Sequence, residues 1–409
     1  MTKEKHYESR SPAYYVRKRL MQNKLAMTGF VIIILSVMTA VLGYLIMPDQ
    51  TPDANDGAVQ IRKKPPGFEV DFIKIRKNAV VLERSLLQKM FHGQESEYIL
   101  VPIRNYRIEG MQVIANLYGK DNYKRSYNLL NIVKPLSIEY SFNAVDLSSD
   151  GNITYVDESG ETQHVYYEEL VRDFKENNVE HRKYLLGTDR SGRDLMSRLI
   201  FGTRISMAIG FIAMLISIFL GMTLGSIAGF YGGSIDAFIV WFMSVVWSIP
   251  GIMLVISISI ALQSRGVWVA FVAVGLTMWV DVARVVRGQI LAMKEKLFVE
   301  AARAFGFSNF RIVFYHILPN IMGPLIVIAT ANFASAIILE AGLSFLGLSV
   351  QPPTPSWGAM IFEGFQAIGT RDSWHLILFP GLAICIMVFT FNLFGNGLRD
   401  ANDPKTLLN

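Results

Sequence analysis

The stretch ISMAIGFIAMLISIFLGMTLGSIAGF, residues 205–230, decides the fold of this chain. Its 26 residues include no charged side chain. As a helix rising about 1.5 Å per residue, it is long enough to cross the roughly 30 Å hydrocarbon core of a bilayer. The stretch therefore predicts a membrane-spanning helix, and similar runs are to be expected on both sides of it.

Five further apolar runs predict spans, which gives six in total. They cover residues 26–47, 237–262, 267–286, 321–339 and 375–394. The first run has 22 residues, too many for the apolar part of a signal peptide, and no small-residue cleavage site follows it. Residues 341–362 are also uncharged, but their prolines favour a loop or a short re-entrant cap. The prediction is an all-α polytopic membrane protein with six transmembrane helices.

The composition changes sharply along the 409 residues. Residues 205–397 carry 15 charges in 193 positions, whereas residues 48–204 carry 45 in 157. The polar stretch is long enough for a small domain with its own core. This contrast predicts a second structural unit inserted after the first span.

The pattern within this insert predicts a mixed α/β fold. Alternating residues at 98–103 and 153–156, with turn signals at Asp150-Gly151 and Ser159-Gly160, indicate strands and a hairpin. Residues 167–178 read as a short helix. The expected order along the chain is a cytoplasmic N-terminus (1–25), a first transmembrane helix (26–47), an extracytoplasmic insert (48–184), a core with five further spans (185–397) and a cytoplasmic C-terminus (398–409).

Basic residues predict the orientation in the membrane. Residues 1–25 hold seven Lys or Arg, among them Lys3, Lys5 and Arg10, against two Glu, which favours the cytoplasm. Six spans then place the C-terminus and the basic segment between spans four and five on the same side. The short outer loop between spans three and four carries only Arg265, and the same parity places the insert outside.

Several function classes are disfavoured by the composition. The net charge of +5 is modest and argues against nucleic-acid binding. The single cysteine, Cys385, allows neither a disulfide framework nor a cysteine-based metal site. No glycine-rich phosphate loop occurs, so any ATP-driven work requires a partner that binds ATP.

The segment between spans four and five carries the strongest functional signal. It reads KEKLFVEAARAFGFSNFRIVFYHILP over residues 294–319. Phe298, Ala301, Ala302 and Phe305 share one helical face, and Gly306 is a natural helix stop. Ser308 can cap a second helix, in which Phe310, Val313, Phe314 and Ile317 repeat the spacing before Pro319 ends it. A helix–turn–helix of this kind, presented by two spans, fits a groove on a partner.

These residues resemble a known family. Glu300-Ala301-Ala302, Gly306 and Ile317-Leu318-Pro319 are similar to the EAA loop of ABC-importer permeases, the segment that docks on the ATPase subunit. His316 precedes Ile317 here, a form similar to the dipeptide and oligopeptide branch. Further resemblance to that branch, as C-type permeases, lies in residues 186–206, 340–347, 351–358, 396–400 and Asp403-Pro404. The long insert after the first span departs from the family pattern.

The resemblance implies a type I ABC importer permease with no catalytic residue. It implies a bacterial inner-membrane subunit that pairs with a second homologous permease, two ATPase subunits or domains and an extracytoplasmic substrate-binding protein. ATP and Mg would be bound by the ATPase partners, and no cofactor or metal by this chain. Glu300 would orient the loop, Ala301 and Ala302 would allow close approach, and Phe305, Phe307 and Phe310 would make the contact. The full set expected to couple to the ATPase is Phe298, Glu300, Ala301, Ala302, Phe305, Gly306, Phe307, Ser308, Phe310, Leu318 and Pro319.

A second group of residues is expected to serve helix packing or gating. Gly221, Gly225, Gly229 and Gly233 are spaced by four, so we expect them on one helix face that another backbone approaches closely. Packing is the simpler reading and a moving surface the other. Pro250 is expected to kink the third span, for packing or for a gate.

Three alternatives remain open at this point. The substrate could be nickel, glutathione or another peptide-like compound. A membrane-anchored protein acting through its extracytoplasmic domain would leave the 294–319 segment unexplained. An ion-driven transporter would need carboxylates deep in the membrane, but we place Asp236 and Asp281 near cytoplasmic ends and Glu340 near an outer end.

Overall fold

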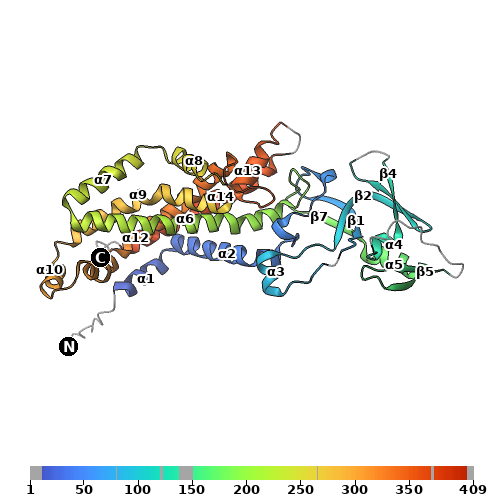
Figure 1. Cartoon of the computed structure of the whole chain (residues 1–409), viewed down its shortest axis with the longest axis horizontal. Coiled ribbons are helices and arrows are strands. Elements are labelled where there is room, and N and C mark those ends of the chain that lie inside the picture. Colours follow the sequence, from blue (N-terminus) through green and yellow to red (C-terminus); the bar gives the residue numbers. More distant parts are fainter. Residues whose placement is uncertain are drawn as a thin grey trace, which may run out of the picture.

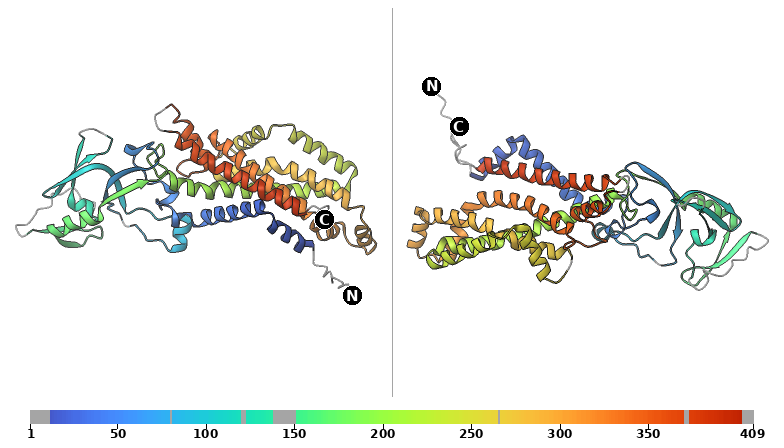
Figure 2. Two further views of the ribbon diagram at one scale, coloured as in Figure 1. Left: turned by 180° about the vertical axis from the view of Figure 1, so that it is seen from behind. Right: turned by 90° about the horizontal axis from the view of Figure 1, so that it is seen from above.

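Figure 1 shows a computed structural model of the chain, which describes residues 12–79, 81–119, 123–137, 151–264, 266–369 and 373–402. The molecule is elongated, with a helical bundle in one half and a region of mixed α/β structure in the other (Figures 1 and 2). Predictions that concern Lys3, Lys5, Arg10, Asp150, Arg265 and Asp403-Pro404 lie outside the described residues.

The bundle is built from long apolar helices with short helices at both ends. Its elements are α1 (Pro12–Gln22), α2 (Lys24–Ile46), α6 (Leu195–Tyr231), α7 (Gly233–Trp247), α8 (Gly251–Ala261), α9 (Val267–Met293), α10 (Leu297–Ala304), α11 (Asn309–Arg311), a π-helical turn (Ile312–Ile317), a 3₁₀ turn (Leu318–Ile321), α12 (Met322–Phe345), α13 (Trp357–Phe365) and α14 (His375–Asn402). The views agree that α1, α10 and the end of α14 lie at the end of the bundle away from the α/β region. The N-terminal helix, the C-terminal helix and the 294–319 segment therefore share one side, as the predicted parity requires.

Five continuous helical segments in the described chain are long and apolar enough to cross a membrane. They are α2, α6, α9, α14 and the run from Asn309 to Phe345 that includes α12. The third predicted span, 237–262, is not one helix: α7 and α8 meet at 93°, and the count reaches six only if this pair is one span. The break falls at Pro250, which lacks the amide hydrogen that a continuous helix would use there.

Helix α9 extends further than the sequence predicts, and this changes the position of Asp281 relative to the helix end. It ends at Met293 rather than near residue 286, so Asp281 lies 14 residues after Val267 and 12 before Met293. Asp281 therefore lies near the middle of this helix, and its depth in the membrane remains a prediction. Asp236 does lie in the first turn of α7, where its carboxylate accepts two hydrogen bonds from Arg287, at 2.5 and 2.7 Å.

Three glycines of α6 bring it into close contact with α9. A Cβ atom at Gly221 would lie 2.4 Å from Val282 Cβ, and one at Gly225 would lie 2.5 Å from the Ala283 carbonyl oxygen. A Cβ at Gly229 would likewise meet the Arg287 carbonyl at 2.9 Å. Gly233 does not belong to this face: α6 ends at Tyr231, and Gly233 is the first residue of α7, at φ +57° with open space around it. Packing against α9 thus accounts for three of the four glycines.

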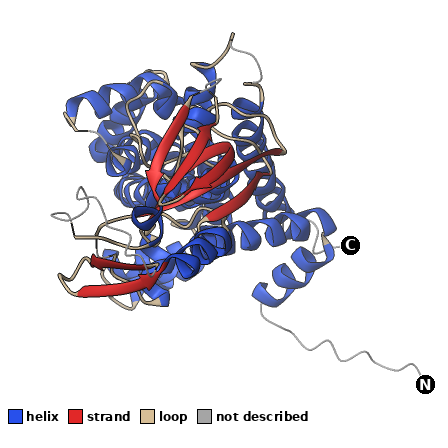
Figure 3. Cartoon of the chain, turned by 90° about the vertical axis from the view of Figure 1, so that its right-hand side faces the viewer, coloured by secondary structure: helices blue, strands red, loops and turns tan. Residues whose placement is uncertain are grey.

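The α/β region contains one antiparallel sheet, whose strands differ in length, and a separate hairpin. The sheet order is β4-β3-β2-β1-β7, and β5 pairs with β6. The bounds are β1 Phe68–Arg76, β2 Tyr98–Glu109, β3 Gln112–Leu117, β4 Lys124–Asn128, β5 Asn152–Val156, β6 Thr162–Tyr166 and β7 Val179–Tyr184, with helices α3 Leu86–His92, α4 Leu129–Val133 and α5 Tyr167–Asn177 and 3₁₀ turns at Pro52–Ala54 and Val59–Ile61. Figure 3 shows the strands gathered at one end of the molecule.

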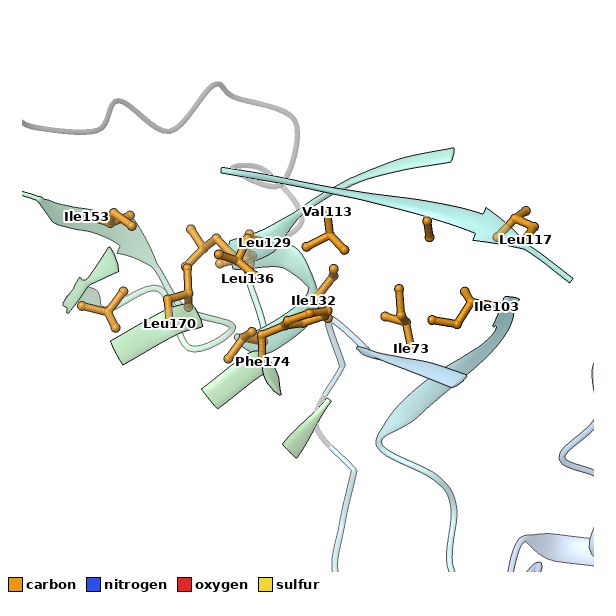
Figure 4. Close-up of a cluster of buried hydrophobic side chains, with 14 residues drawn as sticks. Ile73, Ile103, Val113, Leu117, Leu129, Ile132, Leu136, Ile153, Leu170 and Phe174 are labelled. Atoms are coloured by element: carbon orange, nitrogen blue, oxygen red, sulfur yellow. The ribbon is translucent and has the colours of Figure 1, made fainter. Parts of the chain in front are cut away.

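A buried apolar cluster holds the α/β region together (Figure 4). Ile73 and Ile103 from the sheet pack with Leu170 and Phe174 of α5, and Ile153 of the hairpin joins the same cluster. α5 is strongly amphipathic because its apolar residues recur at helical spacing. Strands begin at Tyr98 and Asn152 and a helix at Tyr167, at or next to the residues where the sequence predicts them. The position of this region outside the membrane remains a prediction.

Buried ion pairs join the α/β region to the bundle. Arg193 Nε lies 2.6 Å from Asp189 Oδ2, and Arg198 Nε lies 3.2 Å from the same atom. Glu363 of α13 reaches both guanidinium groups, at 3.2 and 3.5 Å. Arg193 also donates to Asn55 Oδ1, and Arg198 to the Pro353 carbonyl. Two cations and two carboxylates therefore balance one another at the start of α6.

Candidate functional site

The candidate site is the helix pair that follows α9. α10 covers Leu297–Ala304, with Glu300 in its first turn and Arg303 in its last, an arrangement that complements the helix dipole. Gly306 takes φ +77°. Its amide donates to the Arg303 carbonyl and that of Phe307 to the Ala302 carbonyl, which is the Schellman arrangement of a helix end. Gly306 thus ends the helix as predicted.

The second helix of the pair is capped as predicted but does not end where predicted. Ser308 Oγ accepts a hydrogen bond from the Arg311 amide at 3.4 Å. Pro319 does not terminate the segment, because α11 passes through the π-helical turn and the 3₁₀ turn directly into α12. Pro319 has no amide hydrogen to donate, and the π-helical and 3₁₀ turns change the hydrogen-bond pattern around it, so that the helix continues. The site is therefore continuous with a membrane-spanning helix.

An apolar core lies behind the helix pair. Val299 and Ala302 of α10 and Ile312, Val313, Ile317 and Leu318 pack against Phe230 of α6 and against Val286 and Ile290 of α9. The Arg303 guanidinium lies over the Phe230 ring, 5.5 Å from its centroid. The pair is consequently packed directly against the ends of two long helices.

Aromatic rings cover the opposite side of the pair. Phe305 is 79% exposed and Phe310 is 65% exposed. The Phe310 and Phe314 rings stack with centroids 4.3 Å apart. Phe307 is half-buried between the guanidinium of Arg311, at 4.3 Å, and the parallel ring of His316, at 5.6 Å. The aromatic surface is the name we give to the half-buried Phe307 together with four exposed residues, Phe305, Phe310, Phe314 and Tyr315.

The predicted coupling residues divide between the two sides. Ala302 and Leu318 are buried in the core, and Phe307 is intermediate. Those that face outward are Phe298, Glu300, Ala301, Phe305, Gly306, Ser308, Phe310 and Pro319. Glu300 has no hydrogen bond or ion pair with a described residue, so nothing within the described part of the chain supports its predicted role of orienting the loop.

The sequence does not predict every residue of the aromatic surface or of the apolar core behind the helix pair. Phe314 and Tyr315 belong to the aromatic surface, and Phe314 follows Phe310 at the i, i+4 spacing that would have placed it there. Val299 and Ile312 were not singled out, although they are fully buried. Of the face predicted on α10, Phe298, Ala301 and Phe305 are exposed, whereas Ala302 is buried in the core together with Val299.

The described architecture defines the class of protein: a multi-pass membrane protein with an apolar-backed helix pair between two spans. Residues 221–408 match the family described as binding-protein-dependent transport system inner membrane component. Residues 11–66 match the N-terminal TM domain of oligopeptide transport permease C.

Curated relatives and a solved structure are similar to parts of this chain. The dipeptide transport system permease protein of Alkalihalophilus pseudofirmus is 41% identical over 54% of this chain and 72% of the relative. The glutathione transport system permease protein of Pectobacterium atrosepticum is 42% identical over the same shares. An inward-facing structure of the MetNI methionine ABC transporter covers 50% of this chain and 96% of that chain, with 19% identity and a TM-score of 0.42.

The protein belongs to the family of binding-protein-dependent transport permeases, in the branch of dipeptide and oligopeptide permeases of ABC importers. The relatives that it resembles are transport permeases. Family membership implies, in general, an ATPase partner and a substrate-binding protein.

Proposed function

We propose that this chain forms half of the translocation path of an ATP-driven importer of peptides, together with a second homologous permease. The relatives that support this substrate class are permeases named for dipeptides and for glutathione, itself a peptide. Two ATPase subunits or domains bind ATP and Mg, and an extracytoplasmic binding protein delivers the peptide. This chain itself binds no nucleotide or metal and has no catalytic residue.

The observation that carries the proposal is the aromatic surface on its apolar support. Exposed Phe and Tyr rings on two short helices fit an apolar groove on a partner, and aromatic residues contribute much of the energy of such contacts. When ATP binding draws the ATPases together, the helix pair moves with them. Its core contacts to α6 and α9 then shift the spans between inward-open and outward-open states.

The proposed orientation follows from charge and from the shared side of three segments. α1, the helix pair and the end of α14 face the cytoplasm of a bacterial inner membrane, and the α/β region faces outward. A reporter enzyme that works only in the cytoplasm should be active when it is fused to either terminus. If instead a reporter that works only outside the cytoplasm is active at the termini, the orientation is the reverse of the proposed one. The aromatic surface would then be out of reach of a cytoplasmic ATPase.

Gly306→Asp tests the docking role. A Cβ at position 306 meets no atom within 4 Å, so the change should cost only about 1–2 kcal/mol for a side chain in the left-handed region. It adds a charge to the aromatic surface and should remove the ATPase from the complex purified in mild detergent. Gly306→Asn is the matched control, because Asn adopts this conformation readily and carries no charge.

The expected outcome is an ATPase that co-purifies with the wild type and the Asn variant but not with the Asp variant. An Asp variant that retains ATPase and uptake would refute the docking role. Uptake of labelled dialanine, in competition with longer peptides, glutathione and nickel, tests the substrate class. Competition by nickel alone would replace peptides by a metal ion as substrate.

A second proposal concerns the α/β region, which we assign to docking the binding protein or covering the outer entrance. Its two connections to the bundle run side by side, since the Gly67 amide donates to the Tyr184 carbonyl at 2.9 Å. Residues 68–183 can therefore be replaced by a two-residue turn without stretching the chain. Unchanged uptake by this deletion, with normal insertion, would contradict the proposal.

A further inference from the structure

The break between α7 and α8 opens a cavity of about 450 Å³ toward α9 and α12. Trp247 and Pro250 line it from the break, and Thr277 and Asp281 from α9. Asn332 and Ser335 of α12 close the third side. Polar groups thus gather on the wall of a cavity formed by membrane-spanning helices.

Asp281 lies near the middle of α9, 14 residues after Val267. It is six residues before Arg287, whose pair with Asp236 marks the level where α7 begins. At about 1.5 Å per residue, the carboxylate is therefore about 9 Å further along the helix toward the outside. A span that begins at Val267 and crosses about 30 Å at about 1.5 Å per residue therefore contains position 281.

The carboxylate of Asp281 is exposed on the cavity wall and has no ion pair or hydrogen bond with a described residue. An ionised group facing lipid is costly, and such residues in membrane helices face water-filled cavities or functional partners. Arg284, one turn further on, does not neutralise it. Its guanidinium lies over the Trp247 ring, 4.3 Å from the centroid.

The broken helix adds a second negative feature to the same wall. α7 ends at Trp247 with Ser248 as its C-cap, so the negative end of its dipole lies at the cavity. Interrupted helices whose carbonyl ends coordinate cations are a recurring way to build sites within membrane proteins. A cation entering the cavity would meet both the helix end and the Asp281 carboxylate.

We propose that this cavity is a binding site for the peptide in transit, in which the Asp281 carboxylate accepts hydrogen bonds from the N-terminal ammonium. The inference rests on the proposed function, since peptides supply the ammonium. Asn332, whose side-chain amide is held by the Ser217 hydroxyl at 3.2 Å, presents a fixed polar group on the opposite wall. The apolar lining accommodates side chains of different size, as a permease for many peptides needs.

Cysteine accessibility tests whether the cavity contains water. Cys385, the single cysteine, is first replaced in Cys385→Ser. Thr277→Cys then places a thiol on the cavity wall, and Leu276→Cys places one at the same depth of α9 but outside the lining. A charged methanethiosulfonate should modify the first thiol at least tenfold faster in the permease–ATPase complex in proteoliposomes. Equal rates would overturn the proposal.

Protection of the Thr277→Cys thiol by dialanine, without binding protein, tests the role of Asp281. Asp281→Asn should raise the half-protecting concentration about tenfold, because a charge-assisted hydrogen bond is lost. Asp281→Glu should recover most of the protection. N-acetyl-dialanine, which lacks the ammonium, should bind about tenfold more weakly than dialanine to the wild type and equally to the Asn variant.

The two proposals fail in different ways. If the wild type takes up dialanine but the peptide gives no protection, or gives equal protection in the Asn variant, the cavity is not a peptide site. If the wild-type complex takes up no peptide, the proposed substrate class is wrong. Protection by nickel rather than by dialanine would also refute the assignment of Asp281 to an ammonium group.

Discussion

The two ends of α6 are held in place by different forces. At its start, Arg193 and Arg198 form ion pairs with Asp189 and Glu363, and Arg198 is only 1% exposed. At its end, Phe230 packs in an apolar core with the helix pair and α9. One end is joined by directed polar contacts and the other by apolar surfaces.

This difference indicates which end can move. Ion pairs and hydrogen bonds depend on distance and direction, so they fix the α/β region, α6 and α13 in one arrangement. Apolar contact has no preferred direction, so the helices packed at the inner end can be displaced together, as a unit, at smaller cost. We expect motion to enter the bundle at the inner end and the outer joint to stay fixed.

The largest effect should come from removing a charge at the outer joint. Arg198→Met leaves the buried Asp189 and the partly buried Glu363 facing Arg193 alone and should lower the free energy of unfolding by about 3–4 kcal/mol. Thermal unfolding in detergent measures this. Arg190→Met, at an exposed neighbouring position, is the control and should change little. Equal stability of the two variants would show that the joint is not held by its charges.

At the inner end, stability and docking should separate. Ile312→Ala removes a fully buried side chain and should cost about 2–3 kcal/mol. Phe310→Ala should cost less than about 0.5 kcal/mol, since its ring is largely exposed, but should release the ATPase during purification. If Phe310→Ala unfolds the protein, or if that variant still retains the ATPase, the division into core and aromatic surface is contradicted.

Between the two ends, Gly225→Ala tests the contact of α6 with α9. The added methyl would lie 2.5 Å from the Ala283 carbonyl oxygen, so the helices must separate, at about 1–2 kcal/mol. Gly288→Ala on α9 is the matched control, because its Cβ would meet no atom within 4 Å. That variant should be as stable as the wild type or more so, since Ala favours helix. Reversed stabilities would place the contact elsewhere.

The smallest effect should be a pH dependence in the α/β region. The hydrogen bond from His181 to the Asp71 carboxylate, with the nearby Glu69 charge, raises the pKa of His181 above its usual 6.5. The resulting stabilisation is complete below about pH 6.5 and is lost as the pH rises through the raised pKa. Between pH 5.5 and 8.5, the unfolding midpoint should fall less steeply with rising pH in His181→Asn than in the wild type. His164→Asn is the control and should retain the wild-type slope.

The sequence predicts individual elements better than their limits. Ser308 and Gly306 cap the helices as expected, because capping depends on the residue and its immediate neighbours. Pro319 and Gly233 were misassigned, since a proline is tolerated where helical type changes and a glycine leaves the face when its helix ends. Which side of α10 is buried depends on the position of α9, which no local pattern contains.

The sequence by itself determined the apolar spans, the polar α/β segment, the break at Pro250 and the family signature of residues 294–319. These follow from local composition and spacing, which act over one or two helical turns. Only the tertiary structure decided which aromatic rings stay exposed, which charges pair at the start of α6 and that Asp281 lines a cavity. These properties arise from contacts between segments far apart in the chain, and the free energy of burial depends on what each side chain meets there.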